Sequence, residues 1–536
     1  MKCPAASNGV FCLTSILLCI YNNVCATTSL DRDHAFIGYS ERTSVRCTDK
    51  LPDCMERAVG NGCLYEAFHM RLLCPYSCNI KRCSTQGKRF RHRGFATSQG
   101  TAAYQSMMED LFMIGKGHWR NSTGNVVQPG VTKSGLILGS VGTGTYLGDS
   151  RRRTDEAMES AIIYAASHGL NVIDTASNYR SGRSEAVLGH ALDALLSGGK
   201  ASDFFVTPEP PPAVPLAAYR GTAPQPPFPS SPTPPEYLKL RTRQRDITRD
   251  MLFLSTKAGF VDRHIVEPLL RSGILSSSDV VEGMHCIHPL CLQASLNQSL
   301  LRMNVESVDL LYLHNVAEVQ LNVVGREVFM KRLLEAFKYL EDCRMEGLIK
   351  HYGLATWDCF RVPPSDPMYL PLSSVVQLAK AAAGGGEPGL KFIQLPVSVG
   401  MPEAFAQRGW QSVTALESKG ISSSVKNTNL TLLEVAGELK VGVFGSGPFM
   451  EGDIFPKALG ALDGVLELST QMNTAVKLLQ LTRSVPGLVA TLVGHKEREH
   501  VEENTSVLQY SILDGTEFAS AHAAVSNEMK KISTLA

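Results

Sequence analysis

Short apolar segments alternate with longer amphipathic stretches between about residue 131 and residue 514. The amphipathic stretches, such as 155–169 and 331–347, place apolar residues at helical spacing, and Gly347 stands where a helix C-terminal cap is expected. Eight such strand–helix units predict a parallel (β/α)8 TIM barrel rather than a doubly wound sheet. The predicted strands are 140–145, 171–176, 251–256, 308–313, 349–355, 391–396, 441–445 and 488–494.

Two proline-rich segments interrupt this alternation. Residues 198–245 contain the runs PEPPPAVP and PQPPFPSSPTPP, and residues 362–390 contain Pro363, Pro364 and AAAGGGEPG. Proline is excluded from helix and strand interiors, so we interpret both segments as flexible insertions in the barrel domain, 131–514. Without them roughly 300 residues remain, which is close to the usual size of such a barrel. The polar, weakly patterned residues 84–130 are interpreted as a linker.

Bulk composition restricts the partners of the chain. Its 536 residues are 44% hydrophobic and 19% charged, as in globular proteins, and they exceed one ordinary domain. The formal net charge of +1 gives no electrostatic reason to expect nucleic acid or an anionic membrane as a partner.

The cysteines are concentrated near the N-terminus. Four of the 14 lie in the first 26 residues and six between 47 and 83. The chain begins with Lys2, the short apolar run VFCLTSILLCIY and the small residues around Ala26, which predicts a secretory signal peptide over 1–26. The alternative, an uncleaved membrane anchor, is disfavoured because the apolar run is too short to span a bilayer comfortably. We therefore expect a secreted protein or one in the endomembrane lumen.

A dense, even-numbered cysteine cluster in a protein that enters the secretory route is typical of a small disulfide-rich domain. The segment 47–83 resembles the ShKT domain through its six ordered cysteines, Asp49, Met70 and CPYSC. Arg71 and Leu72 follow Met70 where the related toxins have a Lys-Tyr pair, which disfavours a channel-blocking activity and favours an extracellular protein partner. Six cysteines allow 15 pairings. The resemblance implies the pairs Cys47–Cys83, Cys54–Cys74 and Cys63–Cys78.

Four polar side chains lie at or just beyond the C-terminal ends of three predicted strands. Asp174 lies near the end of the second strand, Tyr179 in the loop after it, Lys257 after the third and His314 after the fourth. These ends converge at the mouth of a parallel barrel, where such barrels carry out chemistry. An ammonium beside a phenol lowers the phenol's pKa, a carboxylate orients the ammonium, and an imidazole can hold a substrate oxygen. The set predicts a proton donor for a carbonyl that receives a hydride from a reduced nicotinamide.

Residues 131–514 resemble the aldo-keto reductase family in GTGTYLG, NVIDTASNY, GRSEAVLG, STK, SLLRMNVESVDLLYLH and GHKEREHVEEN. The resemblance implies a catalytic tetrad of Asp174, Tyr179, Lys257 and His314. It also implies reduction of a small-molecule aldehyde or ketone with NADP(H) or NAD(H).

The resemblance also implies where the nicotinamide end of the cofactor is held. The family's Ser-Asn pair after the fifth strand is replaced by Ala355 and Thr356, so only Thr356 can hydrogen-bond through its side chain. Gln394 matches the family's glutamine on the sixth strand. After the seventh strand, Ser446 and Gly447 stand where the family has an aromatic residue that stacks on the nicotinamide.

In the last loop Gly494, Lys496, Glu503 and Asn504 occupy the region that binds the adenosine end in the family. Lys496, with Arg498 nearby, could neutralise a 2′-phosphate, which favours NADP(H) over NAD(H). The alternative is that both are ordinary solvated charges. Asn504 lies in a glycosylation sequon, and we predict that it is unmodified because a sugar there would obstruct the cofactor.

Two other functional interpretations are open. His285, Cys286, His288 and Cys291 could suggest a metal site, but no second ligand cluster accompanies them, so we expect structural residues and no metal. The departures at Ala355 and Ser446 motivate a nicotinamide-binding sensor with little turnover, which would bind a partner through its ShKT-like module.

Overall fold

The computed structural model describes residues 90–127, 135–196, 247–271, 273–416, 423–455 and 472–535. Eight parallel strands close into a barrel in chain order, and each corresponds to a strand predicted from the sequence. The (β/α)8 barrel is therefore confirmed. The strands are β3 (Val141–Gly144), β4 (Val172–Asp174), β5 (Phe253–Ala258), β6 (Val308–His314), β7 (Ile349–Ala355), β8 (Leu390–Pro396), β11 (Gly442–Ser446) and β12 (Leu488–Gly494).

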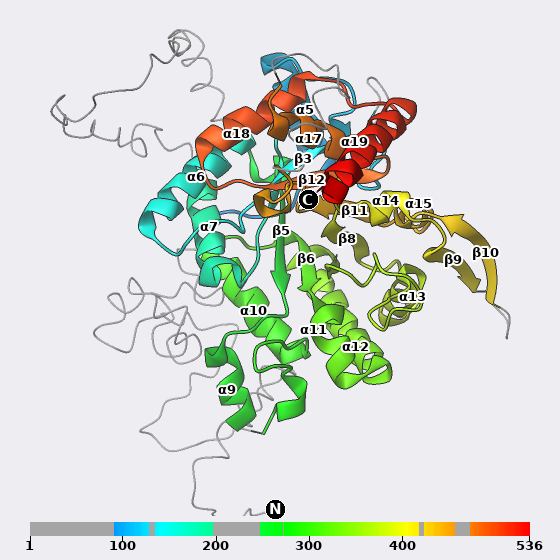
Figure 1. Ribbon diagram of the computed structural model, residues 1–536. Helices are drawn as coiled ribbons and strands as arrows, with labels where there is room; N and C mark the ends of the chain where they lie inside the picture. Colours follow the sequence, from blue (N-terminus) through cyan, green and yellow to red (C-terminus); the bar gives the residue numbers. More distant parts are fainter. Residues whose placement is uncertain are drawn as a thin grey trace, which may run out of the picture.

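Helices surround the barrel (Figure 1). Those between or after the strands are α6 (Arg152–Ser167), α7 (Arg183–Leu196), α9 (Arg263–Arg271), α10 (Pro289–Arg302), α11 (Val316–Val324), α12 (Arg326–Met345), α13 (Leu372–Ala382), α14 (Glu403–Ala406), α15 (Leu432–Glu438), α17 (Thr474–Arg483) and α18 (Arg498–Thr505). Single 3₁₀ turns are η2 (Tyr179–Gly182), η5 (Arg249–Met251), η6 (Ser277–Asp279), η7 (Met450–Gly452) and η8 (Ser506–Gln509). The cap predicted for α12 is present, because Gly347 takes a φ of +71°.

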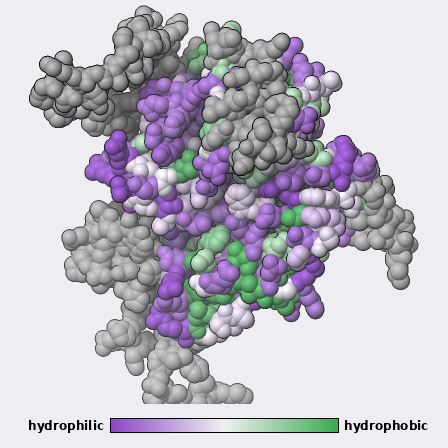
Figure 2. All heavy atoms as spheres, viewed as in Figure 1, coloured by the Kyte–Doolittle hydropathy of each residue, from purple (hydrophilic) through white to green (hydrophobic). Residues whose placement is uncertain are grey.

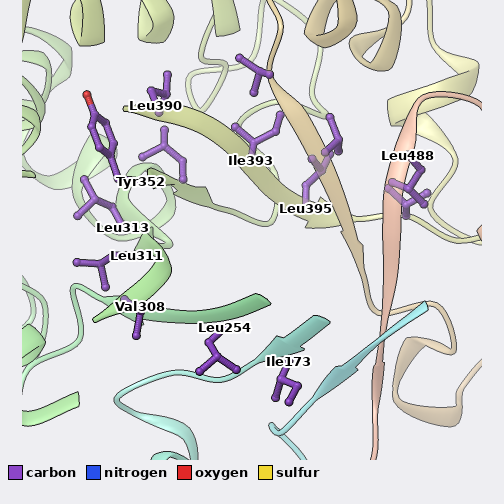
Figure 3. Packing of buried hydrophobic residues seen from close by; sticks show 14 of the residues in the cluster. Ile173, Leu254, Val308, Leu311, Leu313, Tyr352, Leu390, Ile393, Leu395 and Leu488 are labelled. Carbon is purple, nitrogen blue, oxygen red and sulfur yellow. The ribbon is translucent and has the colours of Figure 1, made fainter. Parts of the chain in front are cut away.

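Successive residues of each strand alternate between the barrel interior and the layer beneath the helices. On β6, Leu310 and Tyr312 belong to the interior cluster, whereas Leu311 and Leu313 belong to the outer one. Figure 3 shows the outer layer, where Leu311 and Leu313 lie with side chains of the neighbouring strands. This alternation is why the strands read as continuous apolar runs in the sequence.

Aromatic side chains fill the barrel interior. Phe253, Phe392 and Phe444 come from three strands, and their ring centroids are separated by 5.4 to 5.9 Å. A short antiparallel hairpin, β1 (Trp119–Arg120) with β2 (Leu138–Gly139), adds Leu138 to this cluster. The interior is therefore a packed core, and the mouth is where polar chemistry can lie.

The linker predicted over 84–130 is wrong for its described part, 90–127. Residues Ser98–Leu111 form helix α5, whose N-cap Thr97 accepts a hydrogen bond from the Gly100 amide. Tyr104 and Met108 on this helix are buried in the outer core, and the Tyr104 hydroxyl donates to the Ala166 carbonyl at 2.7 Å. This segment is part of the barrel domain, because its few apolar residues are spaced to bury one helix face.

The insertion predicted over 362–390 is also wrong in part, because α13 lies within it and buries Val375 and Ala379. The proline and glycine runs flank this barrel helix. Two further elements were not expected: helix α19 (Gly515–Leu535) beyond residue 514, and the hairpin β9 (Gln411–Leu416) with β10 (Ser423–Leu430), which projects at the right of Figure 1. The predicted signal peptide, the cysteine module and the insertion 198–245 lie outside the described residues.

Hydrophilic side chains predominate on the face in Figure 2, and hydrophobic ones gather in its lower half. The four described cysteines, Cys286, Cys291, Cys343 and Cys359, are buried free thiols. Within the described residues, no helix combines the length and the apolar character needed to cross a bilayer.

Candidate active site

Strand alternation aims three polar side chains, Asp174, Lys257 and His314, into the barrel mouth. On β4 and β5, the inward residues Val172 and Phe253 are followed two and four positions later by Asp174 and Lys257. His314 is the last residue of β6, two positions beyond the inward Tyr312. The parallel register pairs β4 with β5 and β5 with β6, so the three ends meet at one rim.

Asp174 and Lys257 form a buried ion pair. The Lys257 ammonium donates to Oδ2 of Asp174 and, at 2.9 Å, to the Thr175 carbonyl. Oδ1 of the carboxylate accepts from Ser255 Oγ at 2.6 Å and from Gln394 Nε2 at 3.1 Å. Burial alone would lower the pKa of Lys257, but Asp174 and the nearby phenol outweigh it and raise that pKa. The amine is therefore held charged and in one orientation.

The third partner, Tyr179, is delivered by an unusually tight turn. Arg180 and Ser181 take left-handed conformations, with φ of +50° and +57°, immediately after the tyrosine. The buried Arg180 guanidinium donates to the Asp149 carbonyl at 2.7 Å and pairs with Asp155. This contact offsets the strain of the turn and fixes the backbone at Tyr179.

The Tyr179 ring lies between Lys257 and His314. The ammonium is 4.7 Å from the ring centroid, and the His314 ring centroid is 5.9 Å away at an interplanar angle of 77°. Burial, opposed by the charge and hydrogen bond of Lys257, raises the pKa of Tyr179 above its ordinary value of 10.0. The sequence-based expectation of a lowered pKa is therefore wrong in sign, and the phenol is a neutral acid at physiological pH.

His314 is buried and neutral. Its pKa is held well below the ordinary value by burial, and further by the charge on Lys257. The Phe260 ring packs edge-on against it with a centroid distance of 5.2 Å. A neutral imidazole beside a protonated phenol can share a substrate oxygen without adding charge.

The residues expected at the nicotinamide end lie on the same rim. Thr356 directly follows β7, and its amide donates to the Gln394 carbonyl at 2.8 Å. Its Oγ1 is buried with no hydrogen-bond partner in the part of the chain that is described, apart from the weakly interacting Cys359 thiol. Ser446 ends β11 and is followed by Gly447, which has a φ of +60°. A buried, unsatisfied hydroxyl fits a ligand carboxamide, because it is costly without a partner.

The residues expected at the adenosine end begin at Gly494, the last residue of β12. Gly494 allows close packing there, since an added Cβ would lie 2.8 Å from Leu147. Lys496 is 40% exposed and contacts Glu497, which leaves it accessible to an anion. Arg498 pairs with Glu502, and its guanidinium lies 4.9 Å from the centroid of the Tyr164 ring of α6.

Glu503 and Asn504 lie on α18. Glu503 is half-buried, and Asn504 is 4% exposed. The Asn504 amide lies 3.2 Å from Nε2 of the buried His495. Asn504 therefore belongs to the helix–barrel contact, and a buried amide is a poor acceptor for a sugar.

Several neighbours of the site carry no recognisable sequence signal. Ser255 was hidden within an apolar strand, although its position two residues before Lys257 places it on the inward face. The Tyr146 ring lies 5.2 Å from that of Tyr179 and is 55% exposed. His285 contacts the His314 backbone carbonyl. No group of three or more metal-ligating side chains occurs among the described residues.

A family model described as the aldo/keto reductase family matches residues 138–208 and 236–363. These ranges include the four rim residues, which are Asp174, Tyr179, Lys257 and His314. Several solved structures are similar over most of this chain. An aldo/keto reductase from Klebsiella pneumoniae in complex with NADP and acetate is 16% identical, with a TM-score of 0.42 over 73% of this chain and 93% of its own. An aldo-keto reductase from Bacillus halodurans is 15% identical, with a TM-score of 0.42 over 73% and 94%. The glycerol dehydrogenase from Gluconobacter oxydans is 15% identical, with a TM-score of 0.44 over 77% and 96%. At these TM-scores the structural similarities carry no functional argument.

Proposed function

We propose that this chain is an NADP(H)-dependent aldo-keto reductase that reduces an aldehyde or ketone to an alcohol. The observation that carries the proposal is the buried Lys257, held between the Asp174 carboxylate and the Tyr179 phenol at the mouth of a closed barrel. The family model that spans these residues supports it. A bound nicotinamide would supply the hydride, and Thr356 and Gln394 would hold its carboxamide.

Each rim residue has a distinct task in this mechanism. Tyr179 donates its hydroxyl proton to the substrate carbonyl oxygen as negative charge develops there. Lys257 stabilises the phenolate that remains, and Asp174 keeps the ammonium charged and aimed. The neutral His314 holds the same oxygen by a hydrogen bond, so the carbonyl stays in line with the phenol.

The protonation state of the site favours reduction near neutral pH. Reduction needs the phenol protonated, and its raised pKa keeps it so well above pH 7. Alcohol oxidation needs the phenolate, so its rate should rise as the pH increases toward the pKa of Tyr179. The site is thus arranged to consume the reduced cofactor.

The proposal is tested by following NADPH oxidation across a panel of aldehydes and ketones. Tyr179→Phe should lower turnover by about 10²- to 10⁴-fold, the usual contribution of a general acid. Tyr146→Phe is the matched control, because it removes a hydroxyl from the ring that packs against Tyr179. Equal turnover by the wild type and Tyr179→Phe would exclude the assigned roles.

A second candidate function is a nicotinamide-binding sensor with little turnover. It is favoured by the lack of side-chain donors at Ala355 and by the small Ser446, which reduce contacts to the nicotinamide ring. Titration with NADPH and NADH by cofactor fluorescence distinguishes the two. Tight binding without multiple turnovers on any carbonyl would favour the sensor.

We also propose that the chain enters the secretory route and that its ShKT-like module, 47–83, binds an extracellular protein. The composition of residues 1–26 and the six clustered cysteines support this. Expression in a secreting cell should release a mature chain that begins at Thr27 and has no free thiols in the module. Retention in the cytosol with Met1 intact would overturn it.

A further inference from the structure

The carbonyl of His314 has a side chain as its hydrogen-bond donor. Strand β6 ends at this residue, and Asn315 turns the chain into α11 through a left-handed conformation with a φ of +49°. The His314 carbonyl oxygen accepts a hydrogen bond from Nε2 of His285 at 2.8 Å. The donor, His285, lies in the loop before α10. The hydrogen bond therefore links two segments that are 29 residues apart in the chain.

The His285 ring is fixed in one tautomer by its partners. Because Nε2 donates to a carbonyl, Nδ1 is the acceptor, and it receives the Gln320 side-chain amide at 3.0 Å. The Gln320 side-chain oxygen in turn accepts from the Arg332 guanidinium at 3.3 Å. His285 and Gln320 are fully buried, and burial lowers the pKa of His285 to about 4. The imidazole is therefore neutral and cannot rotate without losing two bonds.

Phe260 connects the two histidine rings directly. Its ring meets the His285 ring at a centroid distance of 5.1 Å and the His314 ring at 5.2 Å, both edge-on. The preceding Gly259 has a φ of +139°, and a Cβ there would lie 2.9 Å from His285 Nε2 and 3.2 Å from the His314 oxygen. This packing leaves no room for His285 to shift while His314 stays in place.

We propose that His285 is a positioning residue for His314: it anchors the His314 backbone by a hydrogen bond and the His314 ring through Phe260. The inference rests on the proposed function, in which His314 holds the substrate oxygen. His285 acts through His314, since no contact joins it to Tyr179 or Lys257 among the described residues. A misplacement of about 1 Å at a reacting group can cost about 10²-fold in rate.

The chain offers a matched control in His118. It is also fully buried, with Nε2 donating to the Gly169 carbonyl at 3.1 Å and Nδ1 3.0 Å from Ser140 Oγ. It lies next to the β1–β2 hairpin, away from the rim residues. A change there perturbs the same kind of buried contact without touching the site.

The experiment compares His285→Leu and His285→Gln with His118→Leu in kcat, KM and thermal stability. His285→Leu should lower kcat about 10- to 100-fold with KM nearly unchanged, and His285→Gln should recover most of it, because an amide can donate to the same carbonyl. His118→Leu should lose comparable stability but keep its kcat. If His285→Leu does not fold, Gln320→Leu replaces it. This change removes the hydrogen bond that His285 Nδ1 accepts, while the His285 side chain itself stays present.

Nitrogen NMR of the His314 imidazole, assigned with His314→Gln, provides a readout that does not need turnover. The His314 ring signals should shift in His285→Leu, because the ring loses its fixed position, and should stay as in the wild type in His118→Leu. A wild-type kcat and an unchanged His314 signal in the His285 variants would overturn the positioning role. Absence of turnover in the wild type would refute the proposed function instead, and the NMR comparison would still decide the role of His285.

Discussion

Replacing Lys257 by Met should separate the two tasks of this ammonium. The change leaves the Asp174 carboxylate, 4% exposed, without its cation, and stranding one partner of a buried pair costs about 3–5 kcal/mol of unfolding free energy. The ammonium also lies 4.7 Å from the Tyr179 ring centroid. With the phenolate charge placed at the ring centroid and an effective dielectric constant of about 20, the pair is worth about 3–4 kcal/mol, or about 2–3 pKa units of the phenol. Turnover should therefore fall at least about 100-fold.

Three matched variants distinguish these effects. The double variant Asp174→Asn/Lys257→Met removes the stranded charge, while the new amide oxygen still accepts from Ser255 and Gln394, so stability should largely return but turnover should not. Lys391→Met, at a more exposed pair with Glu387, should cost at most about 1 kcal/mol. Urea unfolding, NADPH oxidation and ultraviolet titration of the Tyr179 phenol provide the measurements. If Lys257→Met alone kept wild-type stability and phenol pKa, the electrostatic account of the site would be refuted.

Three further outcomes are expected. Arg483→Met should lower the free energy of unfolding by about 3–5 kcal/mol without changing kcat, because the buried guanidinium donates to the Val507 and Tyr510 carbonyls. Urea unfolding measures this loss, and a loss below about 1 kcal/mol would contradict the prediction. Burial lowers the pKa of His118 to about 3 and that of His285 to about 4, so the unfolded chain binds more protons below pH 6.5. The free energy of unfolding should therefore fall between pH 6.5 and pH 4, by about 1–2 kcal/mol per histidine at pH 5. Denaturant titrations at pH 7 and pH 5 should show this loss, and a gain in stability at pH 5 would contradict it. Lys496→Ala should weaken NADPH binding about tenfold and leave NADH binding unchanged; equal losses for both would assign Lys496 no role at a 2′-phosphate.

The strands and rim residues could be predicted because both follow from local periodicity. Inward residues of a barrel strand recur every second position, so Asp174 and Lys257 fall on the interior face of any barrel built from these strands. Their contact then requires only the parallel register of β4 with β5. Gln394 was predicted for the cofactor and in the structure donates to Asp174, a pairing that depends on closure of the whole barrel.

The errors arose where tertiary packing overrides composition. Helix α5 was interpreted as a linker because it is polar overall, although Tyr104 and Met108 suffice to bury one face. Helix α13 was missed because proline and glycine runs dominate its flanks. His285 was expected to be a structural residue, but the contact that it makes was not predicted. Its partner is the carbonyl of His314, and chain spacing gives no sign of a contact made across 29 residues.

The sign of the Tyr179 pKa shift illustrates why spacing predicts which groups meet but not their protonation. A lysine near a phenol always favours the phenolate, and Lys257 has that effect here. Desolvation of this partly buried side chain, which packs against Tyr146, Lys257 and His314, opposes it and is larger. In the proposed mechanism, this balance would keep the proton on the phenol until a substrate oxygen develops negative charge, and Lys257 would then stabilise the phenolate that the transfer leaves behind. In that mechanism burial favours the protonated phenol before the transfer, and the ammonium favours the phenolate after it.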